Sequence, residues 1–305
     1  MAGEVEAFLI AGPTASGKSA LAVRLAEACG GTVVNADSMQ VYRDLAILSA
    51  RPDAAEQAGV PHHLFGFVDG AQEFTVGAWL RAVATLPPGR PRVFVGGTGL
   101  YFKALTEGLV ETPPVPLEIS AAIAARAAGG EDLHAALARL DPEGAARLAP
   151  ADSPRIQRAL AVREATGTSL AQWQVGHSQP PVLAPGSWRG VFLAPARETL
   201  YQRIDRRFEQ MIGQGALQEV AALRARGLPA NRGVMKAHGV PHLIRHLAGA
   251  MALEEAIRLG QQDTRNYAKR QFTWARKFMA GAGWAWCEGA DEALRVLKHP
   301  ATGSG

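Results

Sequence analysis

The chain has 305 residues, of which 48% are hydrophobic, and carries a formal net charge of +4 with a sequence pI near 9.3. That length provides for one large domain with a smaller insertion, and no apolar run approaches the roughly 20 residues of a membrane span. The first six residues are acidic where a secretion signal is basic, and Cys29 and Cys287 form no C-x-x-C pair. We therefore expect a cytoplasmic protein with no membrane partner, no disulfide framework and no cysteine zinc site.

The first predicted element is a buried strand over residues 7–11 that leads through a glycine-rich turn into a helix over 19–28. The turn matches G-x-x-x-x-G-K-[ST], a pattern whose backbone N–H groups and helix N-terminus bind phosphates; a chance glycine turn is the alternative. Lys18 supplies a positive charge for the outer phosphate, and the Ser19 hydroxyl can bind Mg²⁺. The predicted diphosphate-binding residues are Gly12, Pro13, Thr14, Ala15, Ser16, Gly17, Lys18 and Ser19.

Two further predicted strands end beside this turn. A strand over 32–35 leads to Asp37, which can hold Mg²⁺ through water, act as a general base, or merely cap a helix. After helical periodicity over 73–86, a strand over 92–95 runs into a second glycine turn, where Thr98 carries the only hydroxyl. Ligands bind at the carboxyl ends of strands in open α/β sheets, so we expect both turns at one site. His62 and His63 lack metal-ligand spacing, which indicates a structural or surface role.

Two proline-rich stretches, at residues 113–116 and 179–185, enclose a segment in which the alternation of strands and helices stops. The sequence between them is alanine-rich and has helical character. We therefore predict a core domain from residues 1–112 and 186–300, a helical insertion over 113–185 and a disordered tail over 301–305. Inside the insertion a helix begins near Asp152 or Ser153. Arg155 and Arg158 lie on one face of it, suited either to phosphates or simply to solvent.

Strand and helix alternate again after the insertion, with a strand over 190–194 and a helix over 197–210. Arg203 and Arg207 are four residues apart on that helix and share a face, which suggests a diphosphate clamp. A long helix over 253–279 precedes a possible edge strand over 284–287. Residues 264–287 contain no acidic side chain, which suits either a polyanion or a solvated face. The basic residues of this stretch are Arg265, Lys269, Arg270, Arg276 and Lys277.

Six motifs in fixed order resemble the tRNA dimethylallyltransferases of bacterial type. They occupy residues 12–19, 37–43, 96–103, 155–160, 203–208 and 264–274, nearly the whole chain. The resemblance implies an α/β fold, a P-loop NTPase-like core with a mostly parallel sheet and a helical insertion domain. It also implies a prenyl transfer from dimethylallyl diphosphate to N6 of the adenine 3′ of the anticodon. The family motif Asp-Ile-Gly-Thr-Ala-Lys-Pro differs from residues 46–52 here, which read Ala-Ile-Leu-Ser-Ala-Arg-Pro.

By the same resemblance, the phosphate loop holds the diphosphate of the donor rather than ATP, and Mg²⁺ is the expected cofactor. The catalytic residues implied are Asp37 as general base, Thr98 at the nucleotide and Arg207 at the leaving group. The insertion is expected to bind the tRNA anticodon stem-loop, and we expect a monomer. The implied tRNA-binding residues are Asp37, Ser38, Met39, Gln40, Thr98, Pro154, Arg155, Ile156, Gln157 and Arg158.

Three other functions stay open from the sequence alone. An adenylate isopentenyltransferase shares the core but prenylates a free nucleotide, and the arginine-bearing insertion favours RNA over it. A P-loop kinase of a small metabolite turns over ATP without any prenyl donor. A non-catalytic RNA-binding module retains RNA affinity without Asp37 serving as a base.

Overall fold

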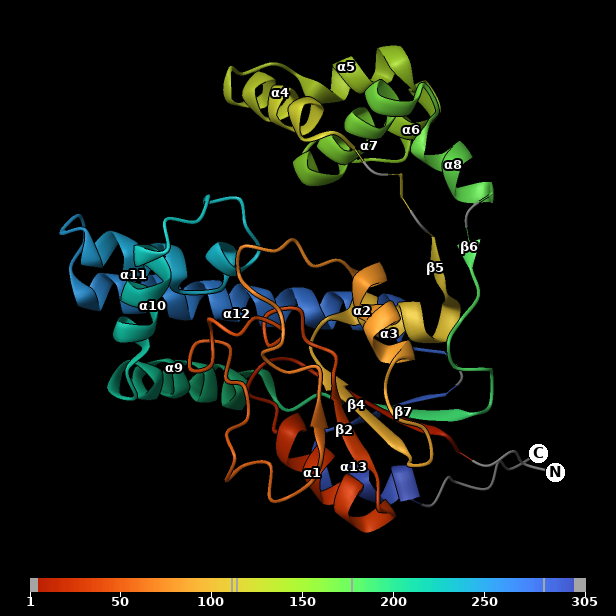
Figure 1. Ribbon diagram of the computed structural model, residues 1–305, viewed down its shortest axis with the longest axis vertical. Coiled ribbons are helices and arrows are strands. Elements are labelled where there is room, and N and C mark those ends of the chain that lie inside the picture. The colour runs from red at the N-terminus through yellow and green to blue at the C-terminus, as the bar shows by residue number, and fades with distance from the viewer. Residues whose placement is uncertain (1–4, 111, 114, 177, 282, 299–305) are drawn as a thin grey trace. The chain divides into compact units, whose positions relative to one another are not determined.

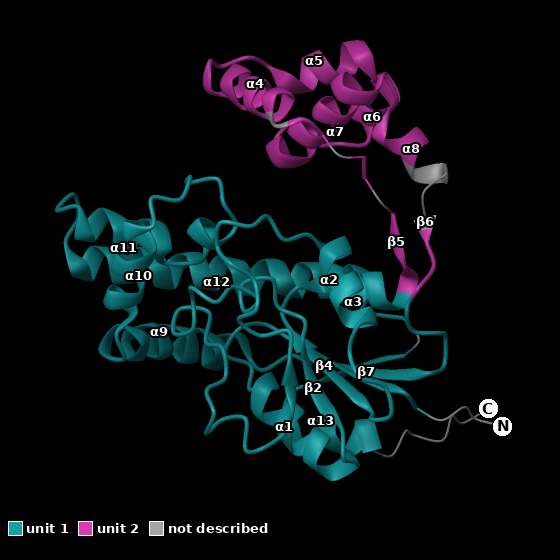
Figure 2. Cartoon of the chain, in the orientation of Figure 1, with its two compact units in different colours: residues 1–106, 182–305 teal, residues 107–181 magenta. Residues whose placement is uncertain are grey.

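The computed structural model describes residues 5–298 except 111, 114, 177 and 282, so the predicted tail over 301–305 lies outside the described residues. The chain divides into two compact units, residues 1–106 with 182–305 and residues 107–181 (Figure 2). Among the described residues, no helix is both long enough and apolar enough to cross a membrane.

Six strands of the first unit form a parallel sheet with the order β3-β2-β4-β1-β7-β8 (Figure 1). The strands are β1 (Ala7–Ala11), β2 (Thr32–Asn35), β3 (His62–His63), β4 (Arg92–Gly96), β7 (Trp188–Leu193) and β8 (Trp284–Cys287). The four strands predicted by the apolar runs before and after the insertion are therefore present, as is the edge strand over 284–287. The histidine pair forms the other edge strand, in agreement with a structural role.

Side chains alternate between the two faces of the sheet, as the two-residue period of a strand requires. Phe8 and Ile10 of β1 pack with α1 (Lys18–Cys29) and α13 (Ala290–Lys298) in one hydrophobic cluster. On the other side, Trp79 of α2 (Val76–Ala84) lies 6.2 Å from Phe94 of β4 and stacks on Tyr101 of α3 (Gly99–Glu107) at 4.3 Å. Helices thus cover both faces, which places the ligand-binding edge at the strand carboxyl ends.

The helix predicted over 73–86 is shorter in the structure because Thr75 caps it. The Thr75 hydroxyl accepts a hydrogen bond from the Ala78 N–H at 3.2 Å, so the regular helix begins only at the following residue.

The C-terminal part of the first unit adds a helical group beside the sheet (Figure 1). Its elements are α9 (Arg197–Gly213), α10 (Ala216–Ala225), the short 3₁₀ turn η1 (Val234–Lys236), α11 (Val240–Leu247) and α12 (Leu253–Phe278). α9 and α12 are confirmed near their predicted limits, whereas α10, α11 and α13 were not predicted. α9 contacts both α10 and α12, and α10 packs on α11.

The second unit begins at residue 107 and ends at residue 181, so the predicted limits of 113 and 185 are both several residues late. At the start, the unit includes β5 (Leu109–Val110), which precedes the first proline run and pairs antiparallel with β6 (Ser178–Gln179); at the end, the chain has returned to the first unit by residue 182, before Pro185. The helices of the second unit are α4 (Leu117–Ala128), α5 (Leu133–Leu140), α6 (Pro142–Ala146), α7 (Ser153–Thr166) and α8 (Leu170–Gly176). Their apolar faces form a separate core around Ile123, Leu137 and Leu160.

Candidate active site

The glycine-rich turn between β1 and α1 has the backbone that phosphate binding needs. Gly17 precedes the helix with φ 89°, a left-handed conformation that glycine adopts without strain, and Ala15 is also left-handed at φ 62°. Left-handed residues placed among right-handed ones turn neighbouring N–H groups toward a common concave side. The turn therefore presents backbone donors together with the N-terminus of α1.

Polar side chains in and opposite this turn lack partners, as expected of an anion site. The Ser16 hydroxyl is buried and makes no hydrogen bond within the described part of the chain. Arg207 of α9 is half-buried in the adjacent pocket, and its guanidinium forms no hydrogen bond or ion pair with any described residue. Burial lowers its pKa, while Glu56 and Asp37 act in the opposite direction. A guanidinium with no partner of this kind is suited to pairing with an anion.

Lys18 lies folded back in this structure, with its Nζ donating to the Pro13 carbonyl at 3.2 Å. Burial lowers the pKa of Lys18 to about 8, an effect that Asp37 opposes and Arg207 reinforces. Loss of water contact is therefore the main cause of the lowered pKa, and an incoming anion stabilises the charged form of the ammonium.

Asp37 is fixed by a turn directly after β2. The buried Asn35 side chain accepts the Asp37 N–H at 2.8 Å and donates to the Asp37 carbonyl at 3.0 Å. One carboxylate oxygen, Oδ1, accepts the Met39 N–H at 2.9 Å, whereas Oδ2 accepts no hydrogen bond from any described residue. Asp37 therefore closes a local turn rather than capping a helix, and its free oxygen lies against Gly97, where an added β-carbon would be 3.4 Å from it.

The Gly97–Thr98 turn connects Asp37 to the phosphate loop. The Thr98 hydroxyl accepts the Ser38 N–H at 3.0 Å and donates to the Ser38 hydroxyl at 3.2 Å. Gln271 of α12, 7% exposed, donates to the Gly97 carbonyl at 2.9 Å and accepts the Thr14 N–H at 3.2 Å. Gly96 has to be glycine, because a β-carbon there would overlap the Ala36 carbonyl. One buried amide thus joins both turns.

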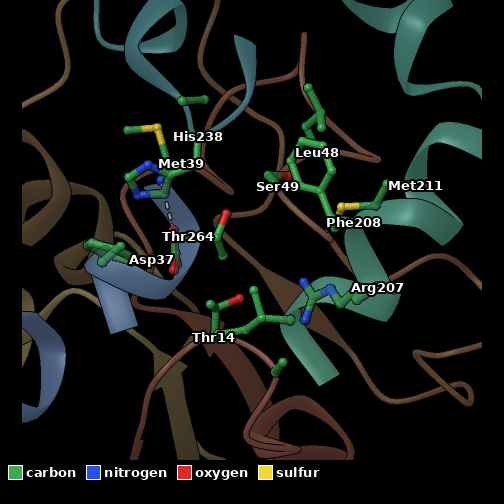
Figure 3. Close-up of a pocket in the computed structure, with 14 residues that line it drawn as sticks. Thr14, Asp37, Met39, Leu48, Ser49, Arg207, Phe208, Met211, His238 and Thr264 are labelled. Carbon is green, nitrogen blue, oxygen red and sulfur yellow. Dashed lines mark hydrogen bonds between the residues drawn. The ribbon is translucent and has the colours of Figure 1, made fainter. Parts of the chain in front are cut away.

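Two pockets meet at Tyr267 of α12, which lines both. The first combines Asp37, Arg207 and the phosphate-loop residue Thr14 with apolar side chains (Figure 3). Its apolar wall consists of Met39, Leu48, Ile204, Phe208, Met211 and Ala237. The second is lined by Thr98, Gln271 and Arg270 together with the apolar and aromatic residues Leu100, Phe102, Phe192, Trp274 and Met279.

Asp37 also influences two aromatic side chains around this junction. Burial, with Asp37 as the next contribution, raises the pKa of Tyr267 well above its usual value. His238 lies 4.7 Å from the Tyr267 ring, and burial and Arg270 lower the pKa of its imidazole. Both groups are therefore neutral near pH 7 and serve as hydrogen-bonding or packing surfaces.

The Mg²⁺ prediction rests on Ser19, the second residue of α1, whose side chain is exposed. The described residues gather no cluster of three His, Cys, Asp or Glu side chains. That composition fits Mg²⁺ only as a partner of a bound diphosphate, because Mg²⁺ in such sites takes one or two protein oxygens and keeps water and phosphate ligands.

The structure separates the predicted tRNA-binding residues into different environments. Asp37, Met39 and Thr98 line the two pockets, whereas the Gln40 amide donates to the carbonyls of Ser49 at 3.0 Å and Ala50 at 2.8 Å. Ser38 is bound to Thr98 as described. Gln40 is thus engaged in holding a loop.

The predicted residues of α7 differ in the same way within the second unit. Ile156 is buried in the core of that unit, and Arg158 donates to Thr112 at 2.8 Å and to the Pro113 carbonyl at 3.0 Å. Arg155 is exposed, as is Pro154, while Gln157 donates to the Ser153 hydroxyl at 2.9 Å. Of this set, Arg155 is the most exposed cation; it pairs with Asp152 at 3.3 Å on the surface of the helix.

The two arginines of the clamp predicted on α9 lie in different environments. Arg207 lines the first pocket, but Arg203 is exposed and does not. Phe208 and Met211 of the same helix contribute to the pocket instead.

Sequence reasoning also missed the roles of Tyr267, Gln271 and Trp274. The signal for them was their spacing of four and three residues, which places them on one face of α12.

Comparison with known proteins adds two family matches. The family model described as IPP transferase matches residues 40–278, and that described as isopentenyl transferase matches residues 5–63.

Two bacterial relatives named tRNA dimethylallyltransferase align along almost the whole length. The Methylocella silvestris protein is 56% identical over 291 residues, covering 93% of this chain and 96% of its own. A Rhodopseudomonas palustris protein is 56% identical over 298 residues, covering 95% and 92%.

Solved structures show the same similarity. The tRNA isopentenylpyrophosphate transferase of Bacillus halodurans superposes with a TM-score of 0.64 at 31% identity, covering 95% of this chain and 93% of that one. A eukaryotic dimethylallyltransferase, described as acting on tRNA, superposes with a TM-score of 0.77 at 26% identity, covering 96% and 76%.

Proposed function

The chain belongs to the IPP transferase family, and on that premise we propose that it transfers a dimethylallyl group from dimethylallyl diphosphate to tRNA. The acceptor is the N6 amine of the adenine 3′ of the anticodon, and diphosphate is released. The observation that carries the proposal is the free Asp37 oxygen, which belongs to the pocket containing Arg207 and lies against Gly97, a residue that lines the aromatic pocket. Because tRNA is found in the cytoplasm, we propose that location as well.

The first pocket suits the donor, which is an anion with a five-carbon apolar tail. The phosphate-loop N–H groups, Ser16, Lys18 and Arg207 bind the diphosphate, and the apolar wall that includes Leu48 and Phe208 packs around the tail. Mg²⁺, when bound through Ser19, neutralises negative charge on the diphosphate. Donors aimed at a leaving group stabilise the charge that grows on it in the transition state.

The second pocket suits a planar base. Thr98 and Gln271 offer hydrogen-bonding edges, while Trp274 and Phe102 offer surfaces for stacking. An adenine within an anticodon loop reaches such a pocket only when it leaves its stack, at a cost of about a few kcal/mol that phosphate contacts offset.

In the reaction, the adenine N6 attacks the allylic carbon while the bond from that carbon to the diphosphate oxygen breaks. Asp37 Oδ2 takes one proton from N6, so the products are the N6-substituted adenine, diphosphate and a protonated carboxyl group. The lone pair of an exocyclic amine is delocalised, which makes it a poor nucleophile. A positioned base and a stabilised leaving group together lower the barrier.

The direct test is incubation of the purified protein with unmodified tRNA and dimethylallyl diphosphate, with Mg²⁺ present or withheld. We expect a five-carbon mass gain on one adenosine, and a much lower yield without Mg²⁺. Parallel reactions contain AMP in place of tRNA, and ATP in place of the prenyl donor. Gain on AMP alone would indicate an adenylate isopentenyltransferase, and ATP turnover without the donor would indicate a kinase; either result contradicts the proposal.

A further inference from the structure

Glu219 of α10 binds a loop that lies more than 170 residues earlier in the chain. Its carboxylate accepts the N–H groups of three successive residues, Ala46 at 2.6 Å, Ile47 at 2.8 Å and Leu48 at 2.9 Å. Oε1 accepts the first two and Oε2 the third, so both oxygens are used. This carboxylate is half-buried and lies outside the pockets described above, and the proposed chemistry leaves it without a role.

The loop over residues 45–50 is also held by hydrogen bonds to its carbonyls, including those from the Ala50 N–H to Ile47 and from the Arg51 N–H to Ala46, both at 2.9 Å. Gln40 binds the carbonyls of Ser49 and Ala50, and the Ser49 hydroxyl donates to the Leu45 carbonyl at 2.6 Å. The N–H groups of residues 46–48, by contrast, donate to Glu219. A backbone N–H withdrawn from water without an acceptor is costly, so Glu219 favours the conformation in which these three donors point toward α10.

The same loop forms part of the apolar wall of the first pocket. Leu48 and Ser49 line it together with Phe208 and Met211 of α9 (Figure 3). Leu48 is also where the family motif has glycine, so its side chain is a feature of this chain's wall. Glu219 thus binds the N–H of a residue whose side chain faces the pocket.

α10 gives Glu219 a rigid base. At the other end of the helix, Arg226 pairs with Asp44 and, at 2.6 Å, with Asp69, and Asp44 accepts the Gly70 N–H at 2.8 Å. Residues at the two ends of α10 therefore bind the chain on both sides of Leu45: Arg226 pairs with Asp44, and Glu219 accepts hydrogen bonds from residues 46–48.

We propose that Glu219 is a positioning residue for the prenyl donor: it holds the Ala46–Leu48 backbone and thereby fixes Leu48 in the wall around the five-carbon tail. This inference rests on the proposed function, because it assigns the first pocket to the donor. Glu219 touches neither substrate and acts through Leu48.

The test compares steady-state kinetics of Glu219→Gln, Leu48→Ala and the double variant. Glu219→Gln keeps the size of the side chain but replaces one acceptor oxygen with an NH₂ that faces an N–H. We expect each single variant to raise KM for dimethylallyl diphosphate about tenfold while KM for tRNA stays within about twofold. The donor KM of the double variant should not exceed that of the single variant with the higher KM, because both changes act on the same pocket wall. Glu219→Asp, which keeps the charge, should recover part of the loss.

Glu254→Gln is the matched control, because Glu254 is an exposed glutamate at the start of α12 and should give wild-type constants. Additive effects in the double variant, an equal rise of both KM values, or an unchanged donor KM in Glu219→Gln would each overturn the inference. If Glu219→Gln does not fold, the test rests on Leu48→Ala. An unchanged KM for dimethylallyl diphosphate in that variant would show that Leu48 does not contribute to donor binding, and would overturn the inference. Absence of transfer by the wild-type protein contradicts instead the proposed function.

Discussion

One carboxylate oxygen of Asp37 is bound in its own turn, whereas the other accepts no hydrogen bond from the described residues, and this difference leads to a prediction for Asp37→Asn. The amide can keep the bond to the Met39 N–H through its oxygen, but it cannot take a proton from N6. We expect kcat for prenyl transfer to fall by about 10²- to 10⁴-fold, while tRNA affinity stays within about threefold. Single-turnover experiments measure the rate of prenyl transfer, and fluorescence anisotropy with labelled tRNA measures the affinity. Loss of tRNA affinity with unchanged turnover contradicts the role as base.

Lys18 leads to a prediction about pH. Burial lowers its pKa to about 8, so the free enzyme loses the ammonium charge as the pH rises through that value. Donor binding needs the charged form, and affinity should therefore weaken progressively above pH 8 and level off below it. Calorimetric titration with an unreactive donor analogue between pH 6.5 and 9.5 checks this. In Lys18→Met the affinity should be low and independent of pH over the same range; the same slope in both proteins assigns the effect to another group.

The residues that could be predicted from sequence are those whose role follows from local pattern. The phosphate loop needs only its glycines, lysine and serine in fixed spacing, and Asp37 and Thr98 each follow directly after an apolar strand. Gln271 and Glu219 could not be assigned this way, because their partners lie 257 and more than 170 residues away. A contact between residues so far apart in the sequence depends on tertiary packing, and tertiary packing produces no local sequence pattern from which the contact could be predicted.

At the level of elements, α9 shows how helix geometry decides between two similar side chains. Arg203 and Arg207 are one turn apart, yet only Arg207 enters the pocket, alongside Phe208 and Met211. We expect Arg207→Ala to raise the donor KM and lower kcat, with about 10²-fold or greater loss in kcat/KM, because a half-buried charge facing the leaving group disappears. Arg203→Ala serves as the matched control and should stay within about twofold in kinetics with both substrates. Equal losses in the two variants would restore the paired clamp that the sequence suggested.

At the scale of the whole molecule, the two units are joined by two chain crossings that the core holds close together. The Leu183 N–H donates to the Leu105 carbonyl at 2.9 Å, and both residues belong to the first unit. The sequence indicated that an insertion exists, since strand–helix alternation stops and prolines appear. It placed the first limit late because β5 precedes the first prolines, and the second because the proline run continues to Pro185, past the crossing at residue 181.

That proximity makes removal of the second unit a feasible test of its proposed RNA role. Replacing residues 107–181 by a short glycine-serine linker should leave the core folded, because each unit has its own hydrophobic cluster and the linker spans a pair already hydrogen-bonded. We expect the affinity for the donor analogue to stay within about threefold, since the phosphate loop and Arg207 remain, and tRNA affinity to fall by at least about tenfold through lost phosphate contacts. Thermal unfolding followed by circular dichroism checks that the core is folded, calorimetry measures the affinity for the donor analogue, and fluorescence anisotropy measures the affinity for tRNA. Undiminished tRNA affinity in a folded deletion variant would place RNA recognition on the core, where the basic residues of α12 are the next surface to neutralise.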